Sequence, residues 1–221
     1  MRQGKSIASS LPHLVFMPES LRGNLPTIIA IHGRGADERD LAPIVEALGL
    51  SDVLLVTPRA PFAFPYGGYL WYGVAEEAIP DPETFGTSLK LLQKFVQEVR
   101  DGYPVNPEQL ILLGFSQGTV MAYATALLQP SAFLAVVALS GYIPSQSGLP
   151  LQLNQLEGFP VFISHGTNDP MIPARLGREA SEILIRANAD VTYREYPMGH
   201  EVTEEVIRDL KQWIRKQVPD A

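Results

Sequence analysis

Ser116 stands between two glycines in the run Gly114-Phe115-Ser116-Gln117-Gly118, which is the strongest chemical signal in the chain. An apolar run, Leu110–Leu113, precedes it and a helix-like run, Thr119–Leu128, follows it. A serine of the form G-x-S-x-G at a tight strand-to-helix turn is exposed as a nucleophile, and larger side chains at the glycine positions would collide. The spacing therefore predicts attack by Ser116 on an acyl carbon, with the backbone N–H of Gln117 facing the substrate.

A serine hydroxyl needs a base within hydrogen-bond reach, and the base needs an acid that holds its tautomer. In proteins with this turn the chain order is serine, then acid, then histidine. Of four histidines, His165 and His200 follow Ser116. We expect His200, which lies between the last expected strand and the final helix, to be the base and Asp169 the acid. Three rival carboxylates fit less well, two because they lie too near His200 in sequence and one because it lies at the wrong end of its strand: Glu195, Glu201 and Asp190. Non-catalytic interpretations stay open: His200 as a helix-capping loop residue and Asp169 as an ordinary turn residue.

A second constellation, His32-Gly33-Arg34-Gly35-Ala36-Asp37, follows an expected strand. A glycine-flanked loop at this point can supply the second N–H of an oxyanion hole. We expect the N–H of Arg34 to pair with that of Gln117 in this role. His32 and His165 are interpreted as structural residues that order their loops. The Arg34 side chain could form a surface ion pair with Asp37 or face the substrate, and both alternatives stay open.

These residues need a scaffold that brings distant loops together. Short apolar runs alternate with longer amphipathic ones, which is typical of a mostly parallel sheet flanked by helices. The expected strands are Leu14–Phe16, Thr27–Ile31, Val53–Thr57, Gln109–Leu113, Leu134–Leu139, Val161–Ser164 and Val191–Glu195. The expected helices are Asp40–Leu48, Pro82–Gly102, Gln117–Leu128, Arg175–Asn188 and Thr203–Gln217. We expect one α/β domain over residues 1–221, in three layers, with about seven strands.

The segment 60–81 is rich in aromatic residues, glycines and prolines and shows no clear period. Such a loop is typical of a functional segment. We expect it to form a wall or lid of an acyl pocket, with Trp71 and Tyr72 as substrate-binding residues and Tyr142 and Met171 as further candidates. The alternative is that Trp71 and Tyr72 only pack the loop onto the domain.

Five motifs together resemble the phospholipase/carboxylesterase family, which includes acyl-protein thioesterases and small bacterial carboxylesterases: His32-Gly33-x-Gly35, Gly114-Phe115-Ser116-Gln117-Gly118, Leu139-Ser140-Gly141-Tyr142, His165-Gly166-Thr167-x-Asp169-x-x-Ile172-Pro173 and Gly199-His200. The resemblance runs from about Leu14 to Gln217. It implies the α/β-hydrolase fold and carboxylic ester hydrolysis without a cofactor. The implied triad is Ser116, Asp169 and His200, and the implied oxyanion donors are Arg34 and Gln117.

The chain departs from the familiar members at two places. Arg34 replaces a leucine, one residue is inserted before Asp37, and Trp71-Tyr72-Gly73 stands where a Trp-Phe-Asp stretch is usual. The charged side chain of Arg34 suggests that the enzyme prefers substrates with acidic or polar acyl groups.

Composition limits the classes of function. The net charge of -7 argues against a nucleic-acid partner, and no apolar run reaches 18 residues, so no membrane span is expected. No signal peptide is visible at the N-terminus, and the absence of cysteine fits a cytoplasmic protein. The histidines fall in separate loops without metal-ligand spacing, so no metal is expected. The expected partner is a small-molecule ester, and a homodimer stays open.

The leading interpretation is a serine carboxylesterase that acts on small to medium acyl chains through an acyl-enzyme. An acyl-protein thioesterase or lysophospholipase would use the same triad. A catalytically inactive hydrolase fold that serves as a binding module is a different class. A dienelactone-hydrolase-like enzyme shares the fold but typically uses a cysteine nucleophile, which this chain lacks.

Overall fold

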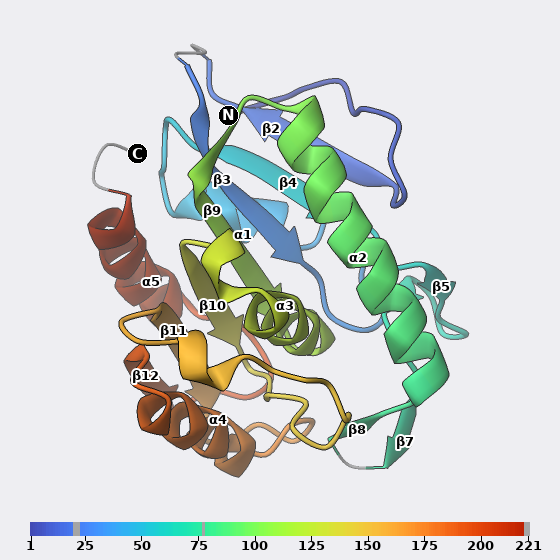
Figure 1. The fold of residues 1–221 in the computed structure, drawn as a ribbon, viewed down its shortest axis with the longest axis vertical. Helices are drawn as coiled ribbons and strands as arrows, with labels where there is room; N and C mark the ends of the chain where they lie inside the picture. Colours follow the sequence, from blue (N-terminus) through green and yellow to red (C-terminus); the bar gives the residue numbers. More distant parts are fainter. Residues whose placement is uncertain (20–22, 77, 219–221) are drawn as a thin grey trace.

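The computed structural model describes residues 1–19, 23–76 and 78–218 (Figure 1). Its centre is an eight-stranded sheet in the order β1-β2-β4-β3-β9-β10-β11-β12. In that order the strands are Arg2–Gln3, His13–Met17, Leu54–Pro58, Leu25–Ile31, Val105–Phe115, Ala135–Leu139, Pro160–Gly166 and Asp190–Tyr196. β1 and β2 pair antiparallel to their neighbours, and the other six strands run parallel. The predicted mostly parallel α/β architecture is confirmed.

Helices cover both faces of this sheet (Figure 1). The residues of α2 (Pro82–Gly102), α3 (Gln117–Leu128) and α4 (Ala174–Arg186) join one hydrophobic cluster, and those of α1 (Ala42–Ala47) and α5 (Glu204–Gln217) join another. β3 contributes to both, because Ile29 and Ile31 face the first cluster and Ile28 and Ala30 face the second. Alternate side chains of a strand point to opposite faces, so an apolar strand in the interior of the sheet serves two cores.

The helix α2 begins at its predicted residue because its start is well specified. Asp81 accepts a hydrogen bond from the Thr84 N–H at 2.9 Å, and Pro82 occupies the first turn. An N-cap aspartate and an early proline both favour helix initiation.

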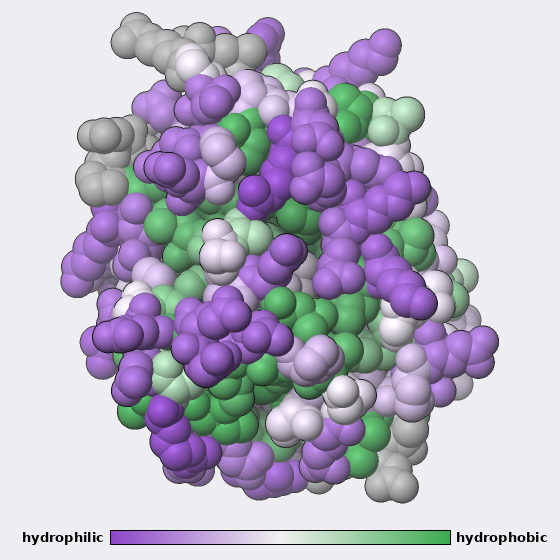
Figure 2. Space-filling model, viewed as in Figure 1, coloured by the Kyte–Doolittle hydropathy of each residue, from purple (hydrophilic) through white to green (hydrophobic). Residues whose placement is uncertain are grey.

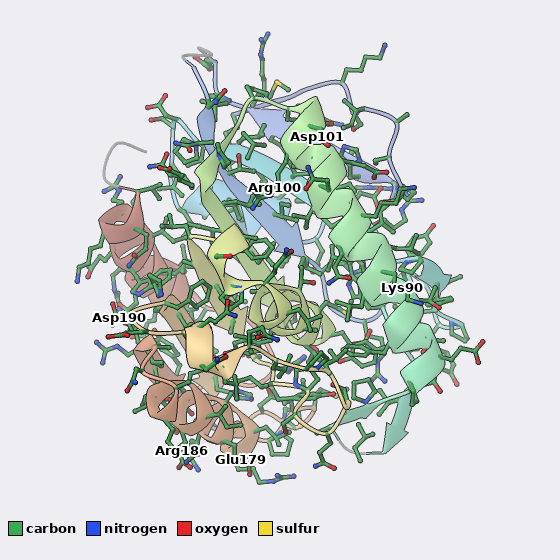
Figure 3. The ribbon with its side chains drawn as sticks, viewed as in Figure 1. Lys90, Arg100, Asp101, Glu179, Arg186 and Asp190 are labelled. Carbon is green, nitrogen blue, oxygen red and sulfur yellow. The ribbon has the colours of Figure 1, made fainter. Side chains whose placement is uncertain are left out.

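Charged residues lie on the outer sides of α2 and α4, including Lys90, Asp101 and Glu179 (Figure 3). On the same face of the molecule, hydrophobic surface shows between hydrophilic patches (Figure 2).

Several boundaries differ from those expected from the sequence. The strand β9 begins four residues earlier, at Val105, because Val105 pairs with Leu25 across an irregular register even though Asn106-Pro107 suggests a turn. The two-residue edge strand β1, which makes the sheet eight-stranded, is too short to show a period. The segment 60–81 contains two short hairpins, formed by β5 (Phe62–Ala63) with β6 (Tyr69–Leu70) and by β7 (Val74–Glu76) with β8 (Ile79–Pro80). Two short 3-10 helices, Pro130–Ala132 and Leu153–Gln155, complete the described elements.

No helix in the described ranges is long and apolar enough to cross a membrane.

Candidate active site

Ser116 lies at the turn between β9 and α3 with backbone angles φ 56° and ψ −119°. Residues other than glycine rarely adopt a positive φ, and residues with this strained backbone cluster at functional sites. Its two glycine neighbours are required by close packing: a Cβ on Gly114 would collide with the carbonyl of Gly118, and a Cβ on Gly118 would collide with the carbonyl of Ile31. The turn is therefore held against the end of β3, and the Ser116 side chain lies at the carboxyl edge of the sheet.

The structure brings the three sequence-predicted triad residues together. His200 Nε2 lies 2.9 Å from Ser116 Oγ, and His200 Nδ1 lies 2.7 Å from Asp169 Oδ2. Asp169 follows β11 and His200 follows β12, so each residue lies in the loop at the carboxyl end of a parallel strand. With a proton on Nδ1, donated to the carboxylate, Nε2 is free to accept the serine proton.

Asp169 is held by hydrogen bonds from its own loop. Asp169 Oδ1 accepts hydrogen bonds from the N–H groups of Met171 at 2.8 Å and Ile172 at 2.9 Å, and its side chain is fully buried. His165 Nε2 donates to the Ile172 carbonyl at 2.8 Å and so braces the same loop. Burial lowers the pKa of the His165 imidazole, which favours its neutral form. His165 therefore contacts the loop that carries Asp169, in agreement with its structural interpretation.

The glycine-rich loop after β3 lies beside the serine. A Cβ built on Gly33 would stand 3.3 Å from Ser116 Cβ, so the backbone that leads into Arg34 runs past Ser116. Gln117 is the first residue of α3, and the first N–H groups of a helix have no carbonyl partner within it. Both expected oxyanion donors thus come from backbone next to Ser116.

Both ring nitrogens of His32 form hydrogen bonds inside the protein. Its Nδ1 donates to the Gly33 carbonyl at 2.6 Å, and its Nε2 accepts from the Ala60 N–H at 3.0 Å. Burial lowers the pKa of the imidazole, in agreement with a neutral ring that makes one donor and one acceptor contact. His32 therefore orders the loop, as the structural interpretation expected.

A small cavity opens over the serine. Its volume is about 150 Å³. Among the predicted site residues it is lined by Ser116, Gln117, Arg34, Tyr72, Tyr142 and Met171. Three lining residues were not predicted from the sequence, namely Val74, Ala78 and Ile172. Two of these, Val74 and Ala78, lie on the β7–β8 hairpin. No local sequence pattern specifies that this hairpin lies beside the cavity. The hydroxyls of Tyr72 and Tyr142 lie 3.5 Å apart within this cavity wall.

Trp71 corrects one expectation, because it does not line this cavity. Its side chain is fully buried, its Nε1–H donates to the His32 carbonyl at 2.8 Å, and its N–H donates to Gln117 Oε1 at 3.1 Å. Its carbonyl accepts a hydrogen bond from the Ser88 hydroxyl. Trp71 therefore packs the aromatic segment onto the domain, whereas its neighbour Tyr72 reaches the cavity.

The Gln117 side chain has a second role that the sequence did not reveal. Its Oε1 accepts from Trp71 and its Nε2 donates to the Tyr72 carbonyl at 2.8 Å. Gln117, which lines the cavity, thus also fastens the aromatic segment to the serine turn. The G-x-S-x-G pattern fixes the position of this residue, but the partners of its amide depend on a loop that returns from elsewhere in the chain.

We expect Trp71→Ala to lower the free energy of unfolding by about 3–5 kcal/mol, since a large buried aromatic is deleted with its hydrogen bond. The ranking of esters by acyl length should stay as in the wild type. Met171→Ala is the matched variant: Met171 is 56% exposed and lines the cavity, so it should shift the ranking with little loss of stability. Denaturant unfolding and an ester series measure both quantities. A changed ranking in a Trp71→Ala protein of unchanged stability would contradict the packing role.

Comparison with known proteins identifies the family. The family model for phospholipase/carboxylesterase matches residues 19–218. The chain belongs to the phospholipase/carboxylesterase family. Members of this family are serine hydrolases, and the chain is accordingly an enzyme of the ester hydrolase class with the α/β-hydrolase fold.

Curated relatives and solved structures agree with this family assignment. Acyl-protein thioesterase 1 of Kluyveromyces lactis is 31% identical over 208 residues, which cover 86% of this chain and 90% of the relative. Carboxylesterase SOBER1 of Arabidopsis thaliana is 27% identical over 207 residues, with the same coverage of 86% and 90%. The crystal structure of the Bacillus cereus carboxylesterase superposes with a TM-score of 0.83 at 26% identity, over 94% of each chain.

Proposed function

We propose that Ser116, His200 and Asp169 form the catalytic triad of a carboxylesterase and that the N–H groups of Arg34 and Gln117 form its oxyanion hole. The observation that carries the proposal is the continuous chain of contacts from Asp169 Oδ2 through the imidazole to Ser116 Oγ, at 2.7 and 2.9 Å. Such spacing lets one proton move from the serine to the histidine as the new bond forms.

The reaction then follows from these positions in two halves. Ser116 Oγ attacks the ester carbonyl carbon while His200 Nε2 takes the hydroxyl proton, and the carbonyl oxygen becomes an oxyanion that the two N–H groups stabilise. The tetrahedral species collapses to an acyl-enzyme as His200 gives its proton to the departing alkoxide. Water then attacks the acyl-enzyme with His200 again as base, and the acid product leaves as Ser116 regains its proton.

Nothing in this sequence of steps requires a cofactor or a metal ion. All of the acid–base and nucleophilic groups come from the chain itself. Among the described residues, no cluster of three or more histidine, aspartate or glutamate side chains is arranged to hold a metal ion.

The size of the cavity supports a short acyl group. Pockets for drug-sized ligands usually measure about 300–1,000 Å³. The cavity over Ser116 is smaller than this range, so a long fatty acyl chain would have to extend beyond it. We therefore favour short and medium carboxylic esters over the acyl-proteins that the name of the Kluyveromyces lactis relative gives, and over lysophospholipids.

A substrate panel tests this proposal. We expect kcat/KM for p-nitrophenyl esters to peak at a short acyl chain and to fall as the chain lengthens. An acyl-CoA and a lysophospholipid measured beside them distinguish the thioesterase and lysophospholipase alternatives. Turnover that rises steadily to long chains, or that occurs with the thioester alone, would contradict a short-chain esterase.

The wider setting of the enzyme belongs to the same proposal. We propose that residues 1–221 act as one α/β-hydrolase domain, in which the segment 60–81 is a wall of the site. The absence of cysteine supports a cytoplasmic location, since disulfides are not needed. The partner is a small-molecule ester. Light scattering would decide whether the protein also forms a homodimer.

A further inference from the structure

Three arginines gather around the loop that follows β3 and the β5–β6 hairpin that covers it. Arg59 donates to both oxygens of Glu38 at 2.6 Å and lies 4.7 Å from the centre of the Tyr69 ring. Glu38 is only 6% exposed, and the bonds from Arg59 lower the pKa of its carboxyl. Arg39 pairs with Asp37 at 3.7 Å. Two of the three guanidinium groups thus have a carboxylate partner within the protein.

Arg34 is the third and differs from the other two. Among the side chains that the structure describes, which do not include those of residues 75–77, no carboxylate lies within ion-pair distance of its guanidinium, whose Cζ stands 5.5 Å from the centre of the Phe64 ring. The Arg34 side chain instead lines the cavity that contains Ser116. Burial raises the pKa of the Tyr72 hydroxyl in the cavity wall, and the Arg34 charge acts on the same hydroxyl in the opposite direction. The positive charge of Arg34 therefore reaches the cavity.

The backbone that carries Arg34 is firmly held. The Gly35 N–H donates to the Tyr69 carbonyl at 2.7 Å, and the Tyr69 N–H donates to the Ala36 carbonyl at 2.8 Å. A Cβ on Gly68 would collide with the Gly35 carbonyl, which shows how closely the loop and the hairpin pack. The N–H of Arg34 is a proposed oxyanion donor. The same well-held residue would therefore position both the reacting carbonyl of the substrate and the guanidinium.

The remaining cavity wall suits a small group that ends in a carboxylate. Val74, Met171 and Ile172 are apolar, while the Tyr72 and Tyr142 hydroxyls can donate hydrogen bonds. A guanidinium matches one carboxylate with two parallel hydrogen bonds. A chain with net charge -7 does not attract anions as a whole, so binding of an anionic ester requires a local cation.

We propose that the substrate of this enzyme is an ester bearing a free carboxylate, and that the Arg34 guanidinium binds this carboxylate while Ser116 attacks the ester. The inference rests on the proposed esterase function and specifies the chemical class of its substrate. The free carboxylate can lie on the acyl side, as in a half-ester of a short dicarboxylic acid, or on the alcohol side, as in an acylated hydroxy acid.

Matched ester pairs test this inference. Monomethyl glutarate is compared with methyl pentanoate for the acyl side, and acetoxyacetate is compared with propyl acetate for the alcohol side. We expect the wild type to prefer the carboxylate member of one pair by about tenfold or more in kcat/KM, and the pair that shows the preference locates the carboxylate. Arg34→Leu should lower that preference about 10- to 100-fold, mostly through KM, as expected for loss of a charge-assisted hydrogen bond. Arg34→Lys should restore part of it.

Arg39→Leu is the matched control, because it removes the same charge from the same loop at a residue that has its own carboxylate partner. Its carboxylate preference should stay within about twofold of the wild type when all variants are compared at the same high ionic strength, which screens the general field of the protein. Equal preferences in Arg34→Leu and Arg39→Leu, or no preference in the wild type, would overturn the role of Arg34. If Ser116-dependent turnover of neutral esters persists in that case, the esterase proposal stands without it. If no ester of either kind is hydrolysed, both proposals fail.

Discussion

Ser116→Ala should reduce kcat/KM for a reactive ester by about 10⁴- to 10⁶-fold, leaving only the rate that substrate binding and the oxyanion hole provide. The substitution removes one oxygen whose contact is His200 Nε2, and it retains the Cβ that the positive φ of this position already accommodates. Folding should therefore be little changed. Initial rates with p-nitrophenyl acetate and a thermal melt measure the two effects. A serine-directed phosphonate should label the wild type once, on Ser116.

Ser140→Ala provides a matched control. Ser140 also follows a parallel strand and also has a positive φ, of 49°, but it is fully buried and its hydroxyl has no hydrogen-bond partner in the described structure. This variant should keep both turnover and phosphonate labelling. Undiminished turnover in Ser116→Ala, or labelling of a different serine, would remove the nucleophile assignment.

The clustering of Ser116, Asp169 and His200 was predictable because its signals are local and their order is fixed. A glycine pair marks the turn at Ser116, and the ends of two parallel strands limit where an acid and a base can follow. Strands of an α/β sheet end at one edge, so the three loops had to meet there. The structure places Asp169 and His200 at that edge, with His200 within hydrogen-bond distance of both Asp169 and Ser116.

The cavity wall was less predictable because contacts between distant segments define it. Trp71 and Tyr72 are adjacent aromatic residues in the same irregular segment, yet the first is buried against His32 and the second lines the cavity over Ser116. Nothing in their residue types separates these roles. The amide of Gln117 accepts from the Trp71 N–H and donates to the Tyr72 carbonyl, so it holds the backbone at both ends of this pair and helps to orient the two side chains. The buried pair of Glu38 and Arg59 was invisible for the same reason, since 21 positions separate its members.

His200→Ala should lower kcat/KM to within about tenfold of the Ser116→Ala level, and the double variant should be little worse, because the two residues act as one unit. Asp169→Asn should cost about 10³- to 10⁴-fold, since an amide can donate to Nδ1 and so leave the proton on Nε2, where the base must accept one. His13→Gln is the control: His13 contacts Tyr103 Oη at 2.7 Å and forms no hydrogen bond with Ser116, His200 or Asp169, so its loss should affect stability and leave kcat/KM of the folded enzyme nearly unchanged. Independent and additive losses in the double variant would mean that His200 is not the base that activates Ser116.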